Sequence, residues 1–470
     1  MDKPNIVFIV CDDLRYESIG VSGNSEVMTP NLDALASNGV SFDEAHIPGG
    51  CCGAVCMPSR AMIHGSKFPS DLKELGAVLP EEQSLLGEEL QENGYQTIGI
   101  GKWHNGTAGY QRSFSDGDRI YFGGMWDHWN VPTHTYEPSG IYEDWKPFSK
   151  SSYTSNEVKL LNTNQIQQGT HSTDLFTDAS IDFLRNKLDK SKPFFLYTAF
   201  MAPHDPRTMP QKYADMYQDL DVELPENFAA IHEFDFGVFD ERDEVLEAYP
   251  RTPEKIKQHI RDYYAMITHI DDSVGRMVNE LKEQGLYDNT IFIFTADHGL
   301  MLGQQGLMGK QNLYEPSVKV PLLMAGPGLP KNYRSDDFVY LMDIFPTLCD
   351  LLNIETPEDL RGESVLPLLA GEKAGRDHLY AGFLEIIRSY RTKDNFKFIA
   401  YQVEGEIHKQ LFNLAEDPYE TRNLAAEASY EEKVRELEAK LFKEAVQWND
   451  LDFLQGQVFW GNYKTASPIL

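Results

Sequence analysis

Seven polar side chains of this chain could do chemistry together, because each closely follows a short apolar run. They are Asp12, Asp13, Lys102, His104, His204, Asp297 and His298. The preceding runs cover residues 6–10, 97–100, 194–200 and 291–294. Runs of this length are typical of strands buried on both faces, as in a parallel sheet covered by helices. Because ligands of such sheets bind beyond the carboxyl ends of the strands, neighbouring strands here would gather these side chains into one active site.

The three acids among these residues, together with a histidine, indicate a bound cation. Asp12, Asp13 and Asp297 would repel one another in one place unless a cation lay among them, and His298 is adjacent. A ligand set dominated by oxygen suits a hard ion, calcium or magnesium. The alternative is that Asp12 and Asp13 only cap the turn that follows them.

Cys56 offers a nucleophile in a segment that reads Cys-Met-Pro-Ser-Arg. A phosphatase loop of the Cys-x5-Arg kind would need arginine where the chain has Met62, so that interpretation fails. A cysteine–histidine pair with His104 or His204 would leave the three acids unexplained. A lone cysteine is a structural, buried residue by default, but the residues that follow Cys56 favour another role.

Composition limits the classes of partner. With 470 residues the chain can bury a large core and form more than one domain. Its net charge of −31 argues against nucleic acid as a partner, because no basic surface is available to meet phosphates. An anionic substrate would therefore need a local basic pocket. The five cysteines, an odd number, do not form a disulfide framework for a chain of this length.

The chain has no apolar stretch that approaches the roughly 20 residues needed to cross a bilayer, so we expect no transmembrane segment. The N-terminus carries no basic leader before an apolar core. We expect a cytoplasmic protein, or a periplasmic or secreted one if a signal peptide has been removed. The oligomeric state is left open.

Strand-like runs alternate with helical patterns as far as Gly371, which predicts an α/β fold. Helices are expected over residues 29–37 and over a long amphipathic stretch, residues 260–281. Residues 105–169 are predicted to be irregular, and their tryptophans suit either stacking against sugar rings or packing within the segment itself. No chemistry is assigned to the acidic patch at residues 233–247.

The pattern changes after Gly371. Residues 386–390 and 396–401 are predicted to form antiparallel strands joined by a turn, and residues 431–442 an amphipathic helix. We therefore expect a catalytic α/β domain over residues 1–375. A small C-terminal domain of antiparallel sheet plus helix is expected over residues 376–470.

The chain resembles the type I (formylglycine-dependent) sulfatases of the alkaline-phosphatase-like superfamily. The matching motifs follow the family's order along nearly the whole chain, at residues 5–13, 56–60, 101–104, 202–204, 295–299 and 309–310. The resemblance implies a large, mixed, mostly parallel sheet flanked by helices, with a smaller C-terminal α+β domain. One departure lies beyond Arg60, where Gly65-Ser66 replaces the family's Thr-Gly and Lys67 stands where arginine is common.

The resemblance also implies a modified nucleophile and a metal. In the family a separate formylglycine-generating enzyme oxidises the cysteine of Cys-x-Pro-Ser-Arg to formylglycine (3-oxoalanine), and the hydrate of that aldehyde attacks sulfur. The residues that this enzyme reads are intact here, so conversion of Cys56 is expected. Calcium would be held by Asp12, Asp13, Cys56, Asp297 and His298.

Further roles follow from the resemblance for the basic residues. Arg60 and Lys102 would stabilise the hydrate, and His104 would assist its later collapse by proton transfer. His204 and Lys310 would contact the sulfate and the leaving oxygen. The expected substrate contacts are Lys102, His204, Lys310 and, on position alone, Arg207.

The sequence therefore predicts a calcium-dependent sulfatase whose partner is a sulfated carbohydrate or another small sulfate ester. A phosphonate monoester or phosphodiester hydrolase, or a choline sulfatase, of the same superfamily is the nearest alternative. A non-catalytic glycan-binding protein, in which Cys56 stays a thiol, is an alternative from another class. The basic residues argue against it, because binding alone would not need them all.

Overall fold

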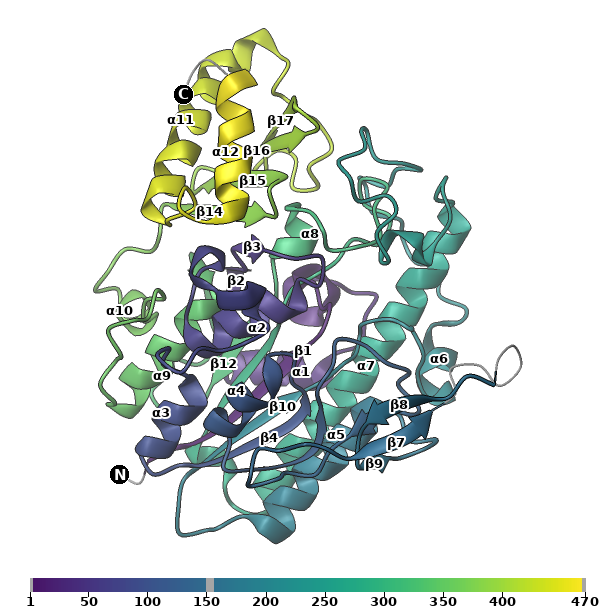
Figure 1. The fold of residues 1–470 in the computed structure, drawn as a ribbon, viewed down its shortest axis with the longest axis vertical. Helices are drawn as coiled ribbons and strands as arrows, with labels where there is room; N and C mark the ends of the chain where they lie inside the picture. Colours follow the sequence, from purple (N-terminus) through teal and green to yellow (C-terminus); the bar gives the residue numbers. More distant parts are fainter. Residues whose placement is uncertain (1–2, 149–155, 467–470) are drawn as a thin grey trace.

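Four parallel strands form the centre of an eight-stranded sheet in the computed structural model, which describes residues 3–148 and 156–466 (Figure 1). They are β1 (Asn5–Cys11), β4 (Gln96–Lys102), β10 (Phe194–Ala199) and β11 (Thr290–Ala296). Their order in the sheet is β11-β1-β10-β4, and each neighbouring pair is parallel. The prediction that the four apolar runs are neighbouring strands is confirmed. All residues of β1 and β11 are buried, because helices cover both faces of the sheet.

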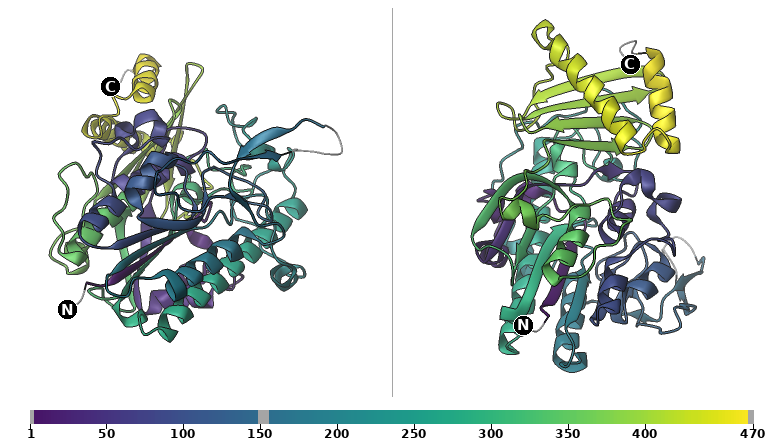
Figure 2. Two further views of the ribbon diagram at one scale, coloured as in Figure 1. Left: turned by 60° about the horizontal axis from the view of Figure 1, so that its bottom comes forward. Right: turned by 90° about the vertical axis from the view of Figure 1, so that its left-hand side faces the viewer.

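Two sets of helices provide this cover (Figures 1 and 2). One set consists of α1 (Pro30–Ser37), α5 (Ser172–Asp182), α6 (Gln211–Tyr217) and α7 (Pro253–Glu283). The other consists of α2 (Cys56–Gly65), α3 (Leu86–Glu92), α4 (Gly106–Ser113) and α9 (Ile344–Leu352). The predicted helices at residues 29–37 and 260–281 correspond to α1 and to the middle of α7.

The outer strands make the sheet mixed. Strand β12 (Leu322–Ala325) runs antiparallel to β11 and to β2 (Gly39–His46). At the two edges, β13 (Tyr333–Tyr340) is parallel to β2, and β5 (Asp116–Tyr121) is parallel to β4. The expected mixed, mostly parallel sheet is therefore confirmed.

A second sheet forms the C-terminal part of the molecule, where two helices pack on it (Figure 2). Its strands are β14 (His378–Phe383), β15 (Ile387–Thr392), β16 (Phe396–Val403) and β17 (Glu406–Asn413), all antiparallel. The helices are α11 (Glu431–Gln447) and α12 (Leu454–Ala466). The predicted hairpin and helix are both present, and the helix extends further than predicted. The domain boundary at residue 376 stays a prediction.

One short strand joins this second sheet to the region around Cys56. Strand β3 (Gly49–Gly50) pairs in parallel with β14. The backbone of Gly49 has φ +93°, and a Cβ there would lie 2.0 Å from the carbonyl oxygen of Gly382. Only glycine permits this approach, so the C-terminal sheet begins next to the segment that leads to Cys56.

The prediction that residues 105–169 are irregular is wrong for part of the segment. Besides α4 and β5 it contains β6 (Pro132–Thr133), β7 (Trp145–Phe148), β8 (Lys159–Asn162) and β9 (Gln165–Ile166). Strand β7 is mostly exposed, so it lacks the apolar alternation by which a half-buried strand is recognised. Residues 149–155 of the segment lie outside the described residues.

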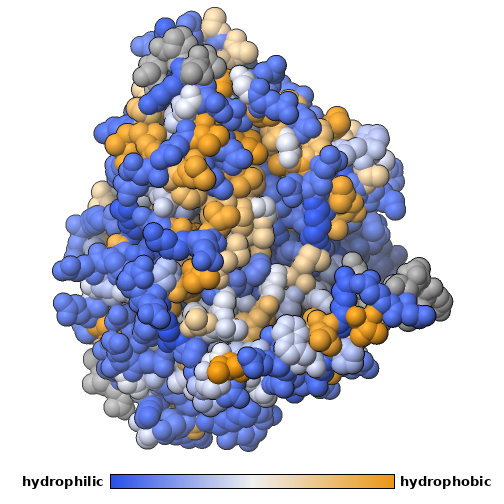
Figure 3. All heavy atoms as spheres, viewed as in Figure 1, coloured by the Kyte–Doolittle hydropathy of each residue, from blue (hydrophilic) through white to orange (hydrophobic). Residues whose placement is uncertain are grey.

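The surface seen in Figure 3 is mostly hydrophilic, with a broken band of hydrophobic residues that descends from the C-terminal part toward the middle. Within residues 3–148 and 156–466, none of the helices has both the length and the apolar character required to span a membrane.

Candidate active site

The carboxyl ends of the central strands bring ten of the predicted site residues together. Asp12 and Asp13 follow β1, Lys102 ends β4, and Asp297 follows β11. The complete set is Asp12, Asp13, Cys56, Arg60, Lys102, His104, His204, Asp297, His298 and Lys310. All except His104 are buried, with at most 5% of the residue exposed.

Cys56 is the first residue of α2, where the helix carries partial positive charge. Its Sγ lies 3.3 Å from Nδ1 of His104. Burial alone would raise the pKa of the thiol, but Lys102 and the hydrogen bond with His104 outweigh burial and hold this pKa well below its usual range. The surroundings of Cys56 therefore favour a negative charge on its side chain.

Four side chains beside the nucleophile could hold a metal ion. Asp12, Cys56, Asp297 and His298 each offer one ligand atom, and these atoms lie within 4.8 Å of one another. Asp12 Oδ1, Asp297 Oδ1 and His298 Nε2 are buried without a hydrogen-bond partner among the described residues. Buried polar atoms are normally hydrogen-bonded, so three unpartnered atoms that converge fit a divalent cation. Burial, followed by the charge of Asp12, raises the pKa of Asp297, and a cation would relieve this repulsion.

The basic side chains of the site each pair with one of the acids. Lys102 Nζ forms an ion pair with Asp12, and both side chains are fully buried. Arg60 Nε lies 2.8 Å from Asp297 Oδ2, and Lys310 Nζ lies 2.7 Å from Asp13 Oδ1. Lys102 is therefore not a surface lysine. The three pairs hold Arg60, Lys102 and Lys310 at fixed, buried positions.

His204 completes the site from the loop after β10. Its Nδ1 lies 2.9 Å from the carbonyl oxygen of Asp205, and its Nε2 lies 3.8 Å from Asp13 Oδ2. His128 Nε2 lies 2.9 Å from the carbonyl oxygen of His204, and the ring of His128 stacks on His171 with centroids 4.9 Å apart. His128 belongs to none of the motifs in the sequence. Its presence among aromatic residues was the only local signal.

The acidic residues 233–247, to which no chemistry was assigned, also reach the site. Asp243 Oδ2 lies 3.6 Å from Lys310 Nζ and accepts a hydrogen bond of 2.8 Å from Gln311 Nε2. Glu244 contacts the backbone that precedes Lys310. These contacts join segments more than 60 residues apart, so no local pattern could have revealed them.

Arg207 lies beside the ten residues rather than among them. Its Nη1 lies 2.9 Å from Nδ1 of His259 on α7. Its Nε and Nη2 are buried and lack a hydrogen-bond partner among the described residues. Contact of Arg207 with a substrate stays a prediction.

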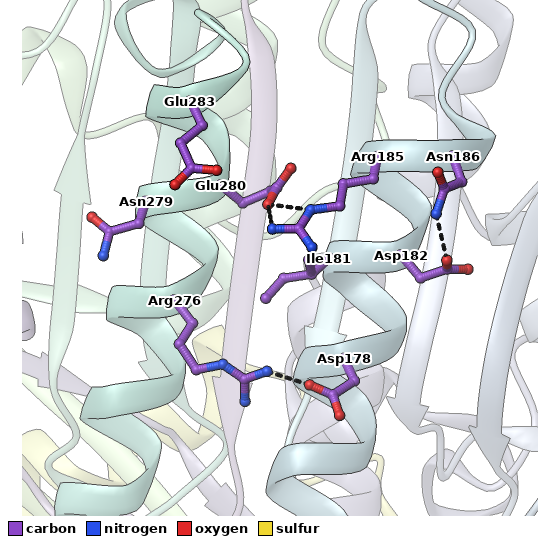
Figure 4. Close-up of a pocket in the computed structure, with 9 residues that line it drawn as sticks. All are labelled: Asp178, Ile181, Asp182, Arg185, Asn186, Arg276, Asn279, Glu280 and Glu283. Atoms are coloured by element: carbon purple, nitrogen blue, oxygen red, sulfur yellow. Dashed lines mark hydrogen bonds and ion pairs between the residues drawn. The ribbon is translucent and has the colours of Figure 1, made fainter.

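A pocket elsewhere on the molecule lacks such an arrangement. It lies between α5 and α7 and has a volume of about 430 Å³ (Figure 4). Two ion pairs cross the pocket, Arg185 with Glu280 at 2.5 Å and Arg276 with Asp178.

Comparisons with known proteins agree with this geometry. Residues 4–354 match the model of the sulfatase family, and residues 303–447 match the C-terminal model of N-sulphoglucosamine sulphohydrolase. An arylsulfatase of Clostridium perfringens is 31% identical over 468 residues, which cover 94% of each protein. An N-acetylglucosamine-6-O-sulfatase of Bacteroides thetaiotaomicron is 26% identical, with 96% of this chain and 88% of the relative covered.

A solved structure is similar over almost the whole chain. It is that of BT4656 in complex with its substrate D-glucosamine-2-N,6-O-disulfate, and it superposes with a TM-score of 0.72 at 25% identity. The superposition covers 96% of this chain and 99% of the other. This chain therefore belongs to the sulfatase family of the alkaline-phosphatase-like superfamily, and it is a hydrolase that acts on sulfate esters.

Proposed function

We propose that this protein hydrolyses a sulfate ester of a carbohydrate through a formylglycine hydrate formed from Cys56, with calcium bound beside it. The observation that carries the proposal is the position of Cys56. It begins a helix, lies 3.3 Å from His104, and shares a cluster of metal-ligand atoms with Asp12, Asp297 and His298. Two relatives support a sugar as substrate, because one is named for N-acetylglucosamine-6-O-sulfate chemistry and the other binds a sulfated glucosamine.

The ligand set suits calcium. Asp12, Asp13, Asp297 and His298 would hold the ion together with the modified Cys56. Carboxylate oxygens predominate, and after oxidation the side chain of Cys56 also offers oxygen, which hard cations prefer. When bound, the ion would polarise the sulfate and neutralise part of its charge.

The aldehyde hydrate would supply the nucleophile. One hydroxyl would give its proton to a neighbouring carboxylate while its oxygen forms a bond to sulfur and the bond between sulfur and the sugar oxygen breaks. The second hydroxyl then loses its proton, the aldehyde re-forms, and sulfate leaves. His104, next to Cys56, is placed to take that proton.

The remaining basic residues would stabilise the charge that develops. Lys102 and Arg60 lie on the side of the nucleophile, bound to Asp12 and Asp297. His204 and Lys310 lie next to Asp13, where they would contact the sulfate and protonate the departing sugar oxygen. Cations that are already fixed in a buried pocket need no reorganisation during the reaction, which makes this stabilisation effective.

The first test is the chemical state of Cys56. Protein produced together with a formylglycine-generating enzyme is digested, and the peptide that carries Cys56 is examined by mass spectrometry. We expect an aldehyde. An unmodified thiol in protein that nevertheless turns over substrate would overturn the formylglycine mechanism.

The second test is turnover. We expect wild-type protein to hydrolyse 6-O- or N-sulfated glucosamine, whereas Cys56→Ala should show no turnover above the uncatalysed rate, because the nucleophile is missing. Thermal unfolding controls for the fold of the variant. Phosphonate monoesters, phosphodiesters and choline sulfate are measured in parallel. Faster hydrolysis of any of these than of every sulfated sugar would contradict the proposed substrate.

A further inference from the structure

Glu244 lies outside every sulfatase motif of the chain, yet it contacts the motif Gly309-Lys310 directly. It begins the short helix Glu244–Leu246 and is 1% exposed. Its Oε1 accepts a hydrogen bond of 2.8 Å from the backbone N–H of Gly309. Its Oε2 accepts one of 2.9 Å from the backbone N–H of Met308. One carboxylate thus binds the two peptide groups that precede Lys310.

A buried arginine neutralises this carboxylate. Arg251 Nη2 lies 2.7 Å from Glu244 Oε2, and neither side chain is more than 1% exposed. Arg251 Nε also donates a hydrogen bond of 3.2 Å to the carbonyl oxygen of Gly306. The pair therefore holds the loop before Lys310 at N–H groups and at a carbonyl. Hydrogen bonds that involve ions are about twice as strong as neutral ones, so this loop is firmly held.

The glycine of the motif makes the contact possible. A Cβ at Gly309 would lie 2.4 Å from Gln311 Oε1, 2.9 Å from the Cβ of Asp243 and 3.1 Å from Glu244 Oε1. No side chain fits there without displacing the segment that carries both acids. Glycine is thus required at position 309 because its backbone packs directly against residues 243 and 244.

The same segment also contacts the side chain of Lys310. Lys310 Nζ lies 3.6 Å from Asp243 Oδ2 and 2.7 Å from Asp13 Oδ1. Gln311 Nε2 donates to Asp243 at 2.8 Å, while Gln311 Oε1 accepts a hydrogen bond of 3.0 Å from the backbone N–H of Lys310. Asp243 therefore contacts the side chain of Lys310 directly, and it contacts the backbone of Lys310 through Gln311.

We propose that Glu244 is a positioning residue, which sets the place of the Lys310 ammonium group at the sulfate ester by fixing the peptide groups of Met308 and Gly309. This inference rests on the proposed function, in which Lys310 contacts the sulfate and the leaving oxygen. A misplacement of about 1 Å in such a group can cost roughly 100-fold in rate. Loss of Glu244 should therefore act on kcat through Lys310 and on no other catalytic group.

The test is a double-mutant cycle with the formylglycine-containing enzyme on a sulfated glucosamine. The variants are Glu244→Gln, Lys310→Ala and the double variant. Glu244→Gln places an amide N–H against a backbone N–H, and we expect kcat to fall about 10- to 100-fold with KM changed less. In the Lys310→Ala background the same substitution should cause no further loss, because its target is gone. Losses that multiply in the double variant, or an unchanged kcat in Glu244→Gln, would overturn the inference.

Two further variants separate positioning from stability. Asp450→Asn removes another buried carboxylate that binds arginine, in the C-terminal part of the chain between α11 and α12. It should lower the melting temperature and leave kcat unchanged. Glu244→Asp keeps the charge on a shorter side chain and should therefore retain more of kcat than Glu244→Gln. If the Glu244→Gln protein does not fold, Glu244→Asp takes its place in the double-mutant cycle. A wild-type enzyme that hydrolyses no sulfate ester overturns the proposed function and this inference with it, whereas an active enzyme with additive losses overturns only the inference.

Discussion

Single atoms determine what the site can hold. Asp12 Oδ1, Asp297 Oδ1 and His298 Nε2 are buried without a hydrogen-bond partner in the described part of the chain, and the imidazole nitrogen lies 3.7 Å from Asp12 Oδ1 and 3.5 Å from Asp297 Oδ1. An unpartnered buried polar atom costs about 1–3 kcal/mol. Three such atoms at one place are a cost that a bound cation removes, so the site is built for the bound state.

This arrangement predicts that calcium stabilises the protein as well as supporting turnover. We expect added calcium to raise the melting temperature, because a ligand at 100 times its Kd stabilises the folded state by about 2.7 kcal/mol. In Asp297→Asn, which loses a charged ligand, the increase should be much smaller. The measurement is thermal unfolding with calcium and with a chelator. Asp336→Asn, which alters an aspartate whose side chain is 89% exposed, is the matched control. An equal increase in Asp297→Asn would show that calcium binds elsewhere.

The burial of the central strands explains why the site residues at their carboxyl ends could be predicted from the sequence. The strands β1, β4, β10 and β11 are buried on both faces, so each appears in the sequence as an unbroken apolar run with its polar residues directly behind it. Four of the motifs were located in this way. The resemblance to a family supplied Arg60, Lys310 and the modification of Cys56, which apolar periodicity does not indicate.

The parts that could not be predicted depend on long-range contacts. Glu244 meets Met308 across 64 positions, and His128 meets His204 across 76. Neither residue has a spacing or neighbour that distinguishes it from a surface acid or a loop histidine. Strand β7 was not predicted because its residues are mostly exposed and show no alternation of apolar and polar side chains.

A stack of rings links the helices beneath His204. His128 stacks on His171, His171 packs on His269 of α7 at 4.9 Å, and His269 stacks on Tyr213 of α6 at 4.5 Å. His171 Nε2 lies 2.9 Å from the carbonyl oxygen of Thr208, so the stack holds the loop of His204 at two carbonyl groups. Burial, aided by neighbouring histidines, lowers the pKa of His171 to about 3.

The stack predicts a loss of stability in mild acid. Burial lowers the pKa of His128 to about 4, below the value of about 6.5 in an unfolded chain. The unfolded state therefore binds more protons, so the contribution of neutral His128 is complete above pH 6.5 and declines as the pH falls toward 4. Between pH 7.5 and 5 the wild type should lose about 2 kcal/mol through this residue.

His128→Gln isolates this contribution, because glutamine keeps an N–H for the His204 carbonyl and does not titrate. The free energy of unfolding in urea, measured at both pH values, should fall less in His128→Gln than in the wild type. The groups that face the stack, Asp174 at 3.1 Å from His269 and Ser172 at 2.6 Å from His128, are the same in both proteins. An equal fall in both would show that His128 does not titrate with folding.

At the scale of the whole molecule, a buried layer of charges connects the two sheets. Glu315 begins the short helix α8 (Glu315–Val318) between them. Its carboxylate lies 2.6 Å from Arg391 of β15, 2.8 Å from Lys397 of β16 and 3.1 Å from His46 of β2. The C-terminal sheet is therefore attached to the catalytic sheet by charges, in addition to strand β3.

The strength of this attachment depends on pH in a definite direction. Burial raises the pKa of Glu315, but Arg391, Lys397 and His46 outweigh burial and hold the pKa well below its usual range. A carboxylate whose pKa is lowered by folding stabilises the protein at a pH above its unfolded value, about 4.3, and loses this effect as the pH falls through its folded value. Glu44 and Glu420 also contact Arg391 and Lys397, so the layer keeps part of its negative charge when Glu315 is neutral.

Glu315→Gln should therefore destabilise the protein by about 3–5 kcal/mol at pH 7, because two buried cations lose a charged partner. The free energy of unfolding in urea is the measurement, with Glu363→Gln as the control. That control breaks an ion pair with Lys373 whose side chains are more than half exposed, and such pairs contribute at most about 1 kcal/mol. The difference between wild type and Glu315→Gln should narrow as the pH falls below 4.3, since the unfolded wild-type chain then gains a proton at Glu315 that the folded protein does not yet bind. A difference that stays constant to lower pH, or that is no larger than in the control, would mean that packing rather than charge holds the two sheets together.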